Sequence, residues 1–124
     1  MSADKPQRIL IVDDEALIRW SLRERLEAEG MEVLEAEDAT SAMDLISTNG
    51  ICAAVLDLRL PDMSGLDVLR AFRIHHPDCP AWIMTAYGND WSRELAERLK
   101  VREFLDKPFD IDELVQKIKE TMLG

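Results

Sequence analysis

Short apolar segments alternate along the chain with segments in which apolar residues recur every three to four positions. The first pattern predicts strands and the second predicts amphipathic helices. The segment 15–29, for example, places Ile18, Leu22 and Leu26 on one helix face and ends before Gly30. The predicted strands are residues 8–12, 32–36, 51–56, 80–84 and 101–105, and the predicted helices are residues 15–29, 39–48, 65–74, 90–99 and 110–123.

Five strands that are each followed by a helix indicate an α/β fold with a parallel sheet between two helical layers. Right-handed crossovers make such a chain a doubly wound sandwich. The segment 51–56 is apolar throughout, which is typical of a strand buried on both faces. Because the 124 residues contain no linker and no repeat, we expect a single domain over residues 1–124.

Composition narrows the classes of function. The chain has 25 acidic and 15 basic residues and a formal net charge of −10, which disfavours direct binding to nucleic acid. Its apolar segments are too short to span a membrane, and it shows no signal-peptide pattern. We therefore expect a cytoplasmic protein without membrane contact, in which Cys52 and Cys79 are free thiols.

Polar residues follow most of the predicted strands. Because the carboxyl ends of parallel strands meet at one edge of a sheet, we expect these residues to come together. They are Asp13, Asp14 and Glu15 after the first strand, Asp57 after the third, Thr85 and Ala86 after the fourth, and Lys107 and Pro108 after the fifth. After the second strand, Glu37 and Asp38 are more typical of a helix start.

Three aspartates, a hydroxyl and a lysine at one edge suit phosphoryl transfer. Neighbouring carboxylates repel unless a cation lies among them, and Mg²⁺ best fits carboxylate, water and phosphate ligands together. The lysine supplies positive charge for a phosphoryl group, and a hydroxyl and a loop N–H can donate to its oxygens. A carboxylate is then the nucleophile. Asp57 is favoured as the nucleophile because it lies at the end of the most buried strand, but this position alone does not exclude Asp13 or Asp14.

Four motifs, in this order, resemble the receiver domain of two-component response regulators. They are ILIVDDE (9–15), VLDLRLPDMSG (55–65), MTA (84–86) and FLDKPF (104–109), within a resemblance that runs from about residue 8 to residue 123. The resemblance implies a flavodoxin/CheY-like sheet with strand order 2-1-3-4-5. The segments LIRWSLRERL (17–26) and KPFDIDEL (107–114) look most like NtrC-like, enhancer-binding activators. That subtype implies a natural chain that continues into an ATPase and a DNA-binding domain.

The resemblance also implies roles for individual residues. Asp57 matches the phosphoacceptor, and Asp13 and Asp14 match the acidic pair that binds Mg²⁺ together with Asp57 and the backbone carbonyl of Arg59. Lys107 matches the lysine that contacts the phosphoryl group.

Further matches concern the residues around the phosphoryl group. Thr85 and Phe104 match the switch pair, and the backbone N–H of Ala86 lies beside the switch hydroxyl. Arg59 and Tyr87 match positions that tune the phosphoryl lifetime, and we expect their large side chains to shield the phosphoryl group from water. The bond between Lys107 and Pro108 matches one that is usually cis in the family.

The function implied is a phosphoacceptor switch that controls transcription within a phosphorelay. A sensor histidine kinase or a small phosphodonor supplies the phosphoryl group, and the domain catalyses only its own phosphorylation and dephosphorylation. The conformational change caused by phosphorylation then reaches the surface formed by residues 90–99, 101–105 and 110–123. An output domain, a downstream protein or a second copy in a homodimer binds there.

Other functions compete with this one. A phosphorylation-independent interaction domain of the same fold is the main alternative, and the complete residue set argues against it. A metal-dependent phosphatase would need a general acid near the nucleophile, where Arg59 stands instead, and a cap insertion that is missing. A flavin or nucleotide site would need a glycine-rich loop after the first strand.

Two details of the helix predicted over 90–99 are also expectations. Trp91, Leu95 and Leu99 have the spacing of a buried helix face, although an exposed Trp91 in a partner surface is the alternative. Many relatives carry Gly-Ala where this chain has Lys100 and Val101. Because lysine enters a left-handed helix cap less readily than glycine, we expect a differently shaped helix end.

Overall fold

The computed structural model of the chain describes residues 7–48 and 50–123, and strands and helices alternate along them. The strands are β1 (Arg8–Val12), β2 (Glu32–Ala36), β3 (Ile51–Asp57), β4 (Ala81–Thr85) and β5 (Glu103–Asp106). The helices are α1 (Ala16–Ala28), α2 (Ala39–Ile46), α3 (Gly65–His75), α4 (Asp90–Arg98) and α5 (Ile111–Leu123). Each element therefore matches a predicted segment, with ends that differ by at most two residues.

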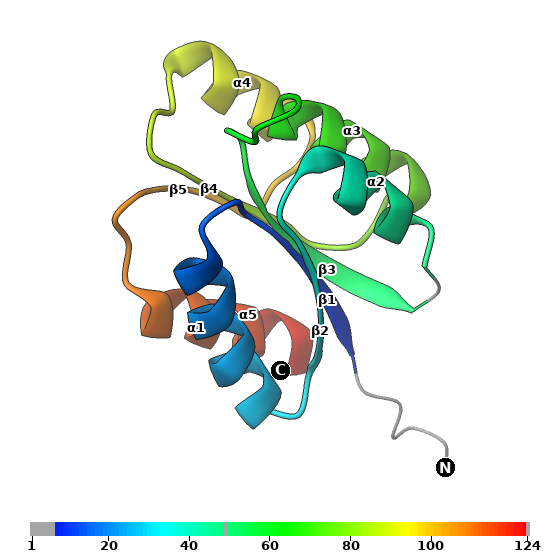
Figure 1. Cartoon of the computed structure of the whole chain (residues 1–124), viewed down its shortest axis with the longest axis vertical. Coiled ribbons are helices and arrows are strands. Elements are labelled where there is room, and N and C mark those ends of the chain that lie inside the picture. Colours follow the sequence, from blue (N-terminus) through cyan, green and yellow to red (C-terminus); the bar gives the residue numbers. More distant parts are fainter. Residues whose placement is uncertain (1–6, 49, 124) are drawn as a thin grey trace.

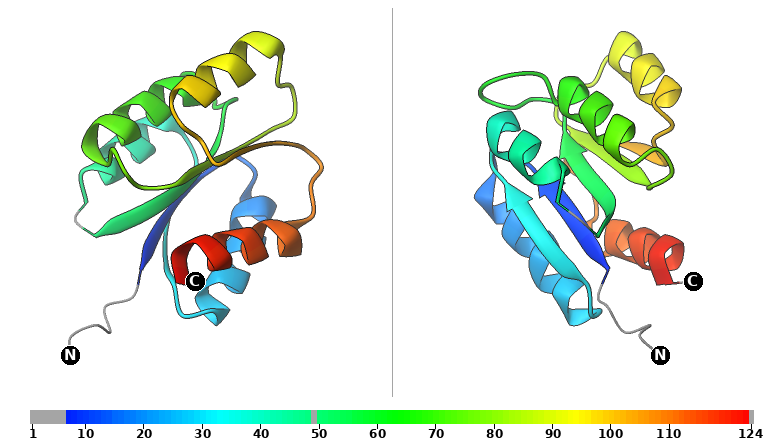
Figure 2. Two further views of the ribbon diagram at one scale, coloured as in Figure 1. Left: turned by 180° about the vertical axis from the view of Figure 1, so that it is seen from behind. Right: turned by 90° about the vertical axis from the view of Figure 1, so that its right-hand side faces the viewer.

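The strands form one sheet in the order β2-β1-β3-β4-β5, and all of its pairs are parallel. Helices α1 and α5 cover one face, and α2, α3 and α4 cover the other (Figures 1 and 2). This arrangement confirms the doubly wound fold and the strand order that the resemblance implied. None of the helices in the described part of the chain is long and apolar enough to cross a membrane.

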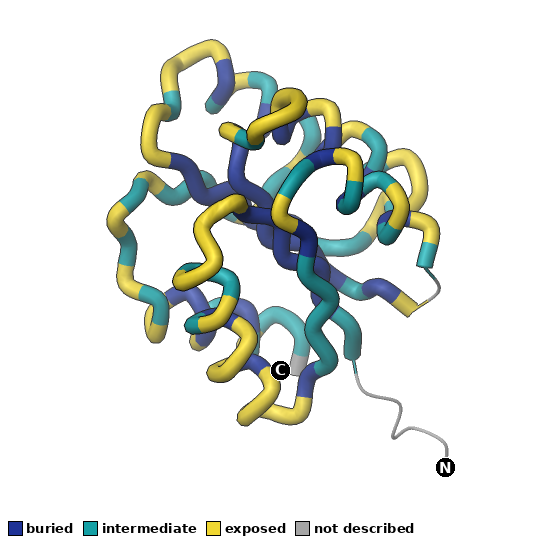
Figure 3. Tube along the Cα trace, in the orientation of Figure 1, coloured by how far each residue is buried: buried dark blue, intermediate teal, exposed yellow. Residues whose placement is uncertain are grey.

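The central strands of the sheet are buried on both faces (Figure 3). In β1, Leu10 and Val12 belong to the core beneath α2 and α3, whereas Ile9 and Ile11 belong to the core beneath α1 and α5. This alternation follows from the two-residue period of a strand. Burial on both sides holds the carboxyl ends of β1, β3 and β4 in fixed relative positions, which is where the candidate site lies.

The exposure of Trp91 corrects one expectation. Its side chain is 67% exposed, whereas Leu95 and Leu99 are partly buried. The buried residues of α4 are Ser92 and Ala96, so the inward face runs through these two small residues. Leu95 and Leu99 flank that face, and Trp91, in the first turn of α4, lies outside it.

The end of α4 differs from expectation as well. Lys100 adopts the left-handed conformation, with φ of 62°, that a glycine would take. The N–H of Lys100 donates to the Glu97 carbonyl at 2.9 Å, and the N–H of Val101 donates to the Ala96 carbonyl at 3.3 Å. The helix thus closes in the ordinary way, and the strain falls on Lys100, at a cost of roughly 1 kcal/mol.

Candidate functional site

Residues from three strand ends meet at the carboxyl edge of the sheet. Asp13 follows β1, Asp57 ends β3, and Lys107 follows β5, where its N–H donates to the Thr85 carbonyl at 2.8 Å. The Nζ atom of Lys107 lies 2.8 Å from Oδ2 of Asp13 and 2.9 Å from Oδ2 of Asp57. These contacts confirm that the strand ends bring the predicted charged residues together. The peptide bond between Lys107 and Pro108 is cis, as the resemblance implied.

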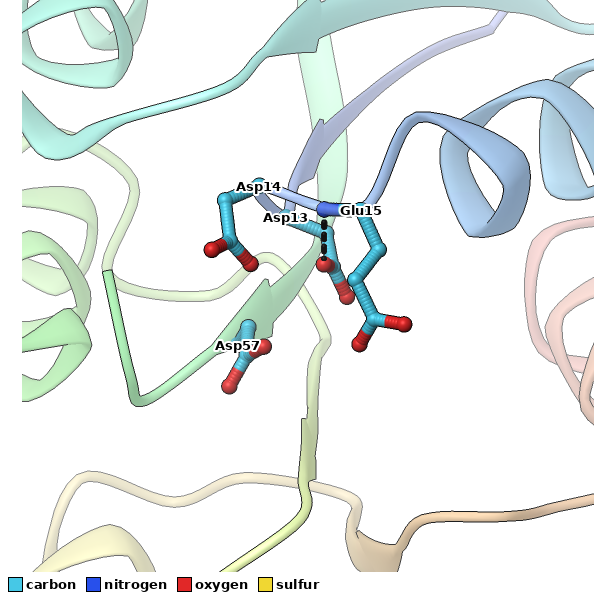
Figure 4. Close-up of side chains that lie close together, drawn as sticks. All are labelled: Asp13, Asp14, Glu15 and Asp57. Atoms are coloured by element: carbon cyan, nitrogen blue, oxygen red, sulfur yellow. Dashed lines mark hydrogen bonds between the residues drawn. The ribbon is translucent and has the colours of Figure 1, made fainter. Parts of the chain in front are cut away.

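Glu15 is a member of this cluster to which the sequence argument gave no role. Its Oε1 atom accepts a hydrogen bond from Nζ of Lys107 at 2.6 Å, so three carboxylates share one ammonium group. The Glu15 N–H donates to Oδ1 of Asp13 at 2.8 Å, as Figure 4 shows. The available signal was the third acidic residue directly after the Asp-Asp pair, but its reach to Lys107 depends on the turn into α1.

Burial and ion pairing act in opposite directions on the charges of the cluster. Burial raises the pKa of Asp13 above its usual value, and the contact with Lys107 offsets part of this effect. Burial lowers the pKa of Lys107, but its contacts with the carboxylates of Asp13, Glu15 and Asp57 outweigh burial and leave that pKa well above its usual value. Lys107 therefore stays charged and provides a fixed positive point beside Asp57.

The acidic side chains fit a hard divalent cation. Asp13, Asp14, Glu15 and Asp57 each offer a carboxylate oxygen, and these oxygens lie within 4.8 Å of one another (Figure 4). Oδ2 of Asp13 is buried and receives no well-aligned hydrogen bond from any described residue, despite its ion pair with Lys107. Oxygen ligands with spare lone pairs are what Mg²⁺ prefers. Asp14 is exposed, so the cluster also opens to solvent.

The loop after β3 holds Asp57 in place. The N–H of Arg59 donates to Oδ1 of Asp57 at 2.9 Å, which fixes the orientation of the carboxylate. The loop then closes on itself, because the N–H of Gly65 donates to the Leu58 carbonyl at 2.8 Å. A Cβ atom on Gly65 would lie 2.0 Å from the Asp57 carbonyl oxygen, so only glycine permits this approach.

The last residue of β4 and the loop after it have fewer fixed contacts. Thr85 is fully buried, yet its Oγ1 atom has no hydrogen-bond partner among the described residues. A Cβ atom on Gly88 would lie 2.5 Å from the Phe104 ring and 3.2 Å from the Thr85 methyl group, so these three residues are in close contact. The guanidinium of Arg93, a residue of α4, lies 4.4 Å from the centre of the Phe104 ring. The predicted switch pair is therefore joined through Gly88.

A stacked pair joins the two loops. The Arg59 guanidinium lies 4.7 Å from the centre of the Tyr87 ring, and the Tyr87 side chain is 73% exposed. On the Lys107 side, a hollow of about 410 Å³ opens beside the cluster. Its lining residues are Glu15, Ile18, Ala86, Lys107, Pro108, Phe109 and Ile111. The site is therefore open to solvent on the Lys107 side.

Fold and site together define a doubly wound α/β protein whose chemistry lies at the carboxyl ends of β1, β3, β4 and β5. Comparison with known families agrees, because the model of the response regulator receiver domain matches residues 9–119. The chain belongs to this family.

Individual relatives support the assignment. The chain is 37% identical over 114 residues to response regulator MprA of Mycobacterium sp. (strain KMS), which covers 92% of this chain and 50% of MprA. It is 38% identical over 112 residues to transcriptional regulatory protein CpxR of Escherichia coli (strain K12), covering 90% and 47% of the two chains. This chain spans about half the length of these curated relatives. They do not support the NtrC-like subtype.

Solved structures give the same fold. A CheY-like response regulator receiver domain protein from Methanospirillum hungatei JF-1 superposes with a TM-score of 0.88 at 31% identity, covering 94% of each chain. The non-phosphorylated HemR receiver domain from Leptospira biflexa has a TM-score of 0.85 at 34% identity, covering 94% of this chain and 93% of HemR.

Proposed function

We propose that this chain is a phosphoacceptor switch in which Asp57 receives a phosphoryl group from a sensor histidine kinase or a small phosphodonor. The observation that carries the proposal is the contact of Lys107 with both Asp57 and Asp13 at the edge of the sheet. A phosphorylation-independent interaction domain would not need this buried set of charges. Family membership adds to the support.

In the reaction, an Asp57 oxygen attacks the phosphorus atom, and the bond between phosphorus and the donor's leaving group breaks. The leaving group departs with the electron pair, so Asp57 carries an acyl phosphate. Lys107, which lies 2.9 Å from Oδ2 of Asp57, stabilises the added negative charge, and the backbone N–H of Ala86 donates to a phosphoryl oxygen. Water later cleaves the acyl phosphate, which releases inorganic phosphate and restores the Asp57 carboxylate, so the domain catalyses its own phosphorylation and dephosphorylation.

Mg²⁺ completes the site in this proposal. Asp13, Asp14, Asp57 and the backbone carbonyl of Arg59 would hold the ion, and Glu15 lies close enough to join them. When bound, the ion neutralises the clustered carboxylates and accepts a phosphoryl oxygen. The buried Oδ2 atom of Asp13, which lacks an aligned hydrogen bond, supports this assignment.

Thr85 and Phe104 relay the change. The Thr85 hydroxyl has no partner among the described residues, so a phosphoryl oxygen on Asp57 offers it a hydrogen bond. Movement of Thr85 disturbs the contact between Gly88 and Phe104 and alters the face formed by α4, β5 and α5. An output domain, a downstream protein or a second copy of the chain reads this face.

Transcriptional control is the output we propose for the whole protein, because CpxR is named as a transcriptional regulatory protein. The NtrC-like subtype stays a prediction from the segments 17–26 and 107–114 alone. The receiver itself is proposed to make no direct contact with nucleic acid, in keeping with the net charge of −10.

Intact mass after treatment with acetyl phosphate and Mg²⁺ tests the proposal. Wild type should gain one phosphoryl group, whereas Asp57→Asn should gain none. Asp44→Asn, which changes an exposed aspartate on α2, is the matched control and should behave like wild type. A gain in Asp57→Asn would show that another residue is the nucleophile. No gain in wild type with either acetyl phosphate or a histidine kinase would favour the interaction domain.

The Arg59 and Tyr87 pair is proposed to shield the acyl phosphate from water. The stacked pair joins the two loops beside Asp57, and its loss would open a path for water. Arg59→Ala and Tyr87→Ala should each shorten the lifetime of the phosphorylated protein, and the double variant should add little because either change breaks the pair. Arg70→Ala, on the exposed surface of α3, is the control. Decay rates equal to wild type would contradict shielding.

A further inference from the structure

Two aspartates from different parts of the chain bind the N-terminus of α2. Asp38 is the helix's own N-cap, and its Oδ1 atom accepts from the Ser41 N–H at 2.8 Å. Asp62 comes from the loop between β3 and α3. It accepts from the N–H groups of Ala39 and Thr40 at 2.8 and 2.9 Å, and from the Thr40 hydroxyl at 2.6 Å. The second carboxylate therefore joins α2 to the loop that follows Asp57.

The contact of Asp62 completes the anchoring of this loop. The base of the loop is closed by the Leu58 and Gly65 hydrogen bond and by the bridge between Arg59 and Ser64. Asp62 lies between these two bridged residues and attaches the tip to α2. Helix α2 packs against the sheet through Ala39, Ala42 and Ile46, so the tip is tied to the rigid core.

This attachment bears on the candidate site through Arg59. The Arg59 N–H donates to Oδ1 of Asp57, and Arg59 lies three residues before Asp62 in the same short loop. The positive end of the α2 dipole favours a charged carboxylate at Asp62. Hydrogen bonds from the Thr40 side chain and the Ala39 N–H lower the pKa of Asp62 to about 2, so the attachment persists at neutral pH.

We propose that Asp62 is a positioning residue for phosphoryl transfer, which holds the Arg59 peptide against the Asp57 carboxylate by clamping the loop tip to α2. The inference rests on the proposed function of the site. It adds a residue that touches neither the phosphoryl group nor the metal. The carbonyl of Arg59, which lies one peptide unit further along the loop than this N–H, is the proposed Mg²⁺ ligand, so a loosened tip weakens both metal binding and the orientation of the nucleophile.

Asp38 provides the matched control, because both aspartates cap the same helix and only Asp62 belongs to the loop. The experiment compares wild type, Asp62→Ala, Asp62→Asn and Asp38→Ala in three measurements. These are the Mg²⁺ dissociation constant by titration calorimetry, the initial rate of phosphorylation by acetyl phosphate, and the thermal unfolding midpoint. Asp62→Asn retains one side-chain acceptor, so it provides a folded variant for these measurements even when Asp62→Ala fails to fold.

We expect Asp62→Ala to weaken Mg²⁺ binding by about tenfold and to slow phosphorylation, with an intermediate effect for Asp62→Asn. Asp62→Ala and Asp38→Ala should lower the unfolding midpoint by similar amounts. Asp38→Ala should nevertheless leave the Mg²⁺ dissociation constant unchanged. Equal Mg²⁺ affinities for the Asp62 variants and Asp38→Ala would overturn the inference and reduce Asp62 to a helix cap. Wild type that neither binds Mg²⁺ nor gains a phosphoryl group would instead overturn the proposed function itself.

Discussion

The loops after β3 and β4 lie at the same edge of the sheet but are anchored very differently. The loop after β3 is closed at its base by the Leu58 and Gly65 hydrogen bond and fixed at its tip by Asp62 on α2. Thr85 is the last residue of β4, and its buried hydroxyl has no partner among the described atoms. The loop that follows β4 runs through the exposed Tyr87. Asp57, the proposed nucleophile, is thus held still, while the Thr85 hydroxyl is free to take a new partner.

This difference suits a switch. A fixed carboxylate keeps its geometry with Lys107 and the acidic residues, which favours reaction over reorganisation. A buried hydroxyl without a hydrogen bond destabilises the folded protein by about 1 to 3 kcal/mol, and a new acceptor nearby removes this penalty. Phosphorylation of Asp57 would supply that acceptor, so the change should appear mainly on the Thr85 side.

The same substitution in each loop should have different effects. Gly65→Ala places a Cβ atom 2.0 Å from a backbone oxygen of Asp57, which cannot move without displacing β3, so we expect a loss of more than about 3 kcal/mol of stability. Gly88→Ala meets the Phe104 ring, a side chain that can rotate, so we expect a loss of about 1 kcal/mol. Urea unfolding measures both values. Equal losses would show that the loops do not differ in rigidity.

Lys107 contacts both regions, so removal of its ammonium group tests how they are joined. Its N–H donates to the Thr85 carbonyl, and its Nζ atom binds Asp57 and Asp13. Lys107→Met leaves buried carboxylates without their cation, and we expect a loss of about 2 to 3 kcal/mol in metal-free buffer. Addition of Mg²⁺ should recover part of the loss in urea unfolding. Unchanged metal-free stability would mean that the ion pairs contribute nothing net.

Thr85→Val replaces the buried hydroxyl with a methyl group of similar size. Because the Oγ1 atom has no partner in the described structure, we expect a gain of about 1 kcal/mol in the free energy of unfolding. Phosphorylation of Asp57 should still occur, but the Phe104 ring should no longer respond to it, which aromatic NMR signals would reveal. A destabilised Thr85→Val protein would indicate that the hydroxyl already has a partner.

Acid should weaken the fixed loop through Asp62, and this is the smallest effect we expect. Its pKa is lowered from 3.8 to about 2 in the folded protein, so Asp62 stabilises the fold above pH 4 and loses this contribution as the pH falls from about 4 to about 2. The stability difference between wild type and Asp62→Asn should therefore shrink across this range. A difference that stays constant between pH 5 and pH 2 would contradict it.

The strands could be predicted from the pattern of apolar residues, and the charged cluster could be predicted from the parallel order of those strands. Apolar runs mark the strands, and the carboxyl ends of parallel strands must meet, which places Asp13, Asp57 and Lys107 together. The capping role of Asp38 was also readable, since its N-cap bond to Ser41 is local.

Contacts that depend on loop paths could not be predicted. The contacts of Glu15 with Lys107 and of Asp62 with α2 join residues distant in sequence through irregular backbone. The exposure of Trp91 was the alternative and not the main expectation, because three apolar residues at helical spacing suggest one buried face, whereas the small Ser92 and Ala96 form that face. Lys100 adopts the left-handed conformation at the end of α4, where the hydrogen bonds from its N–H and that of Val101 close the helix, although lysine disfavours this conformation.

Amide hydrogen exchange on the phosphorylated and unphosphorylated protein would show which of the two loops moves when Asp57 is phosphorylated. Both samples would contain Mg²⁺, with intact mass confirming one phosphoryl group on wild type and none on Asp57→Asn. We predict that exchange changes in residues 86–90 and around Phe104, while residues 58–64 keep the same protection. A change confined to residues 58–64, or one of equal size in both loops, would contradict the account of a fixed nucleophile beside a movable hydroxyl.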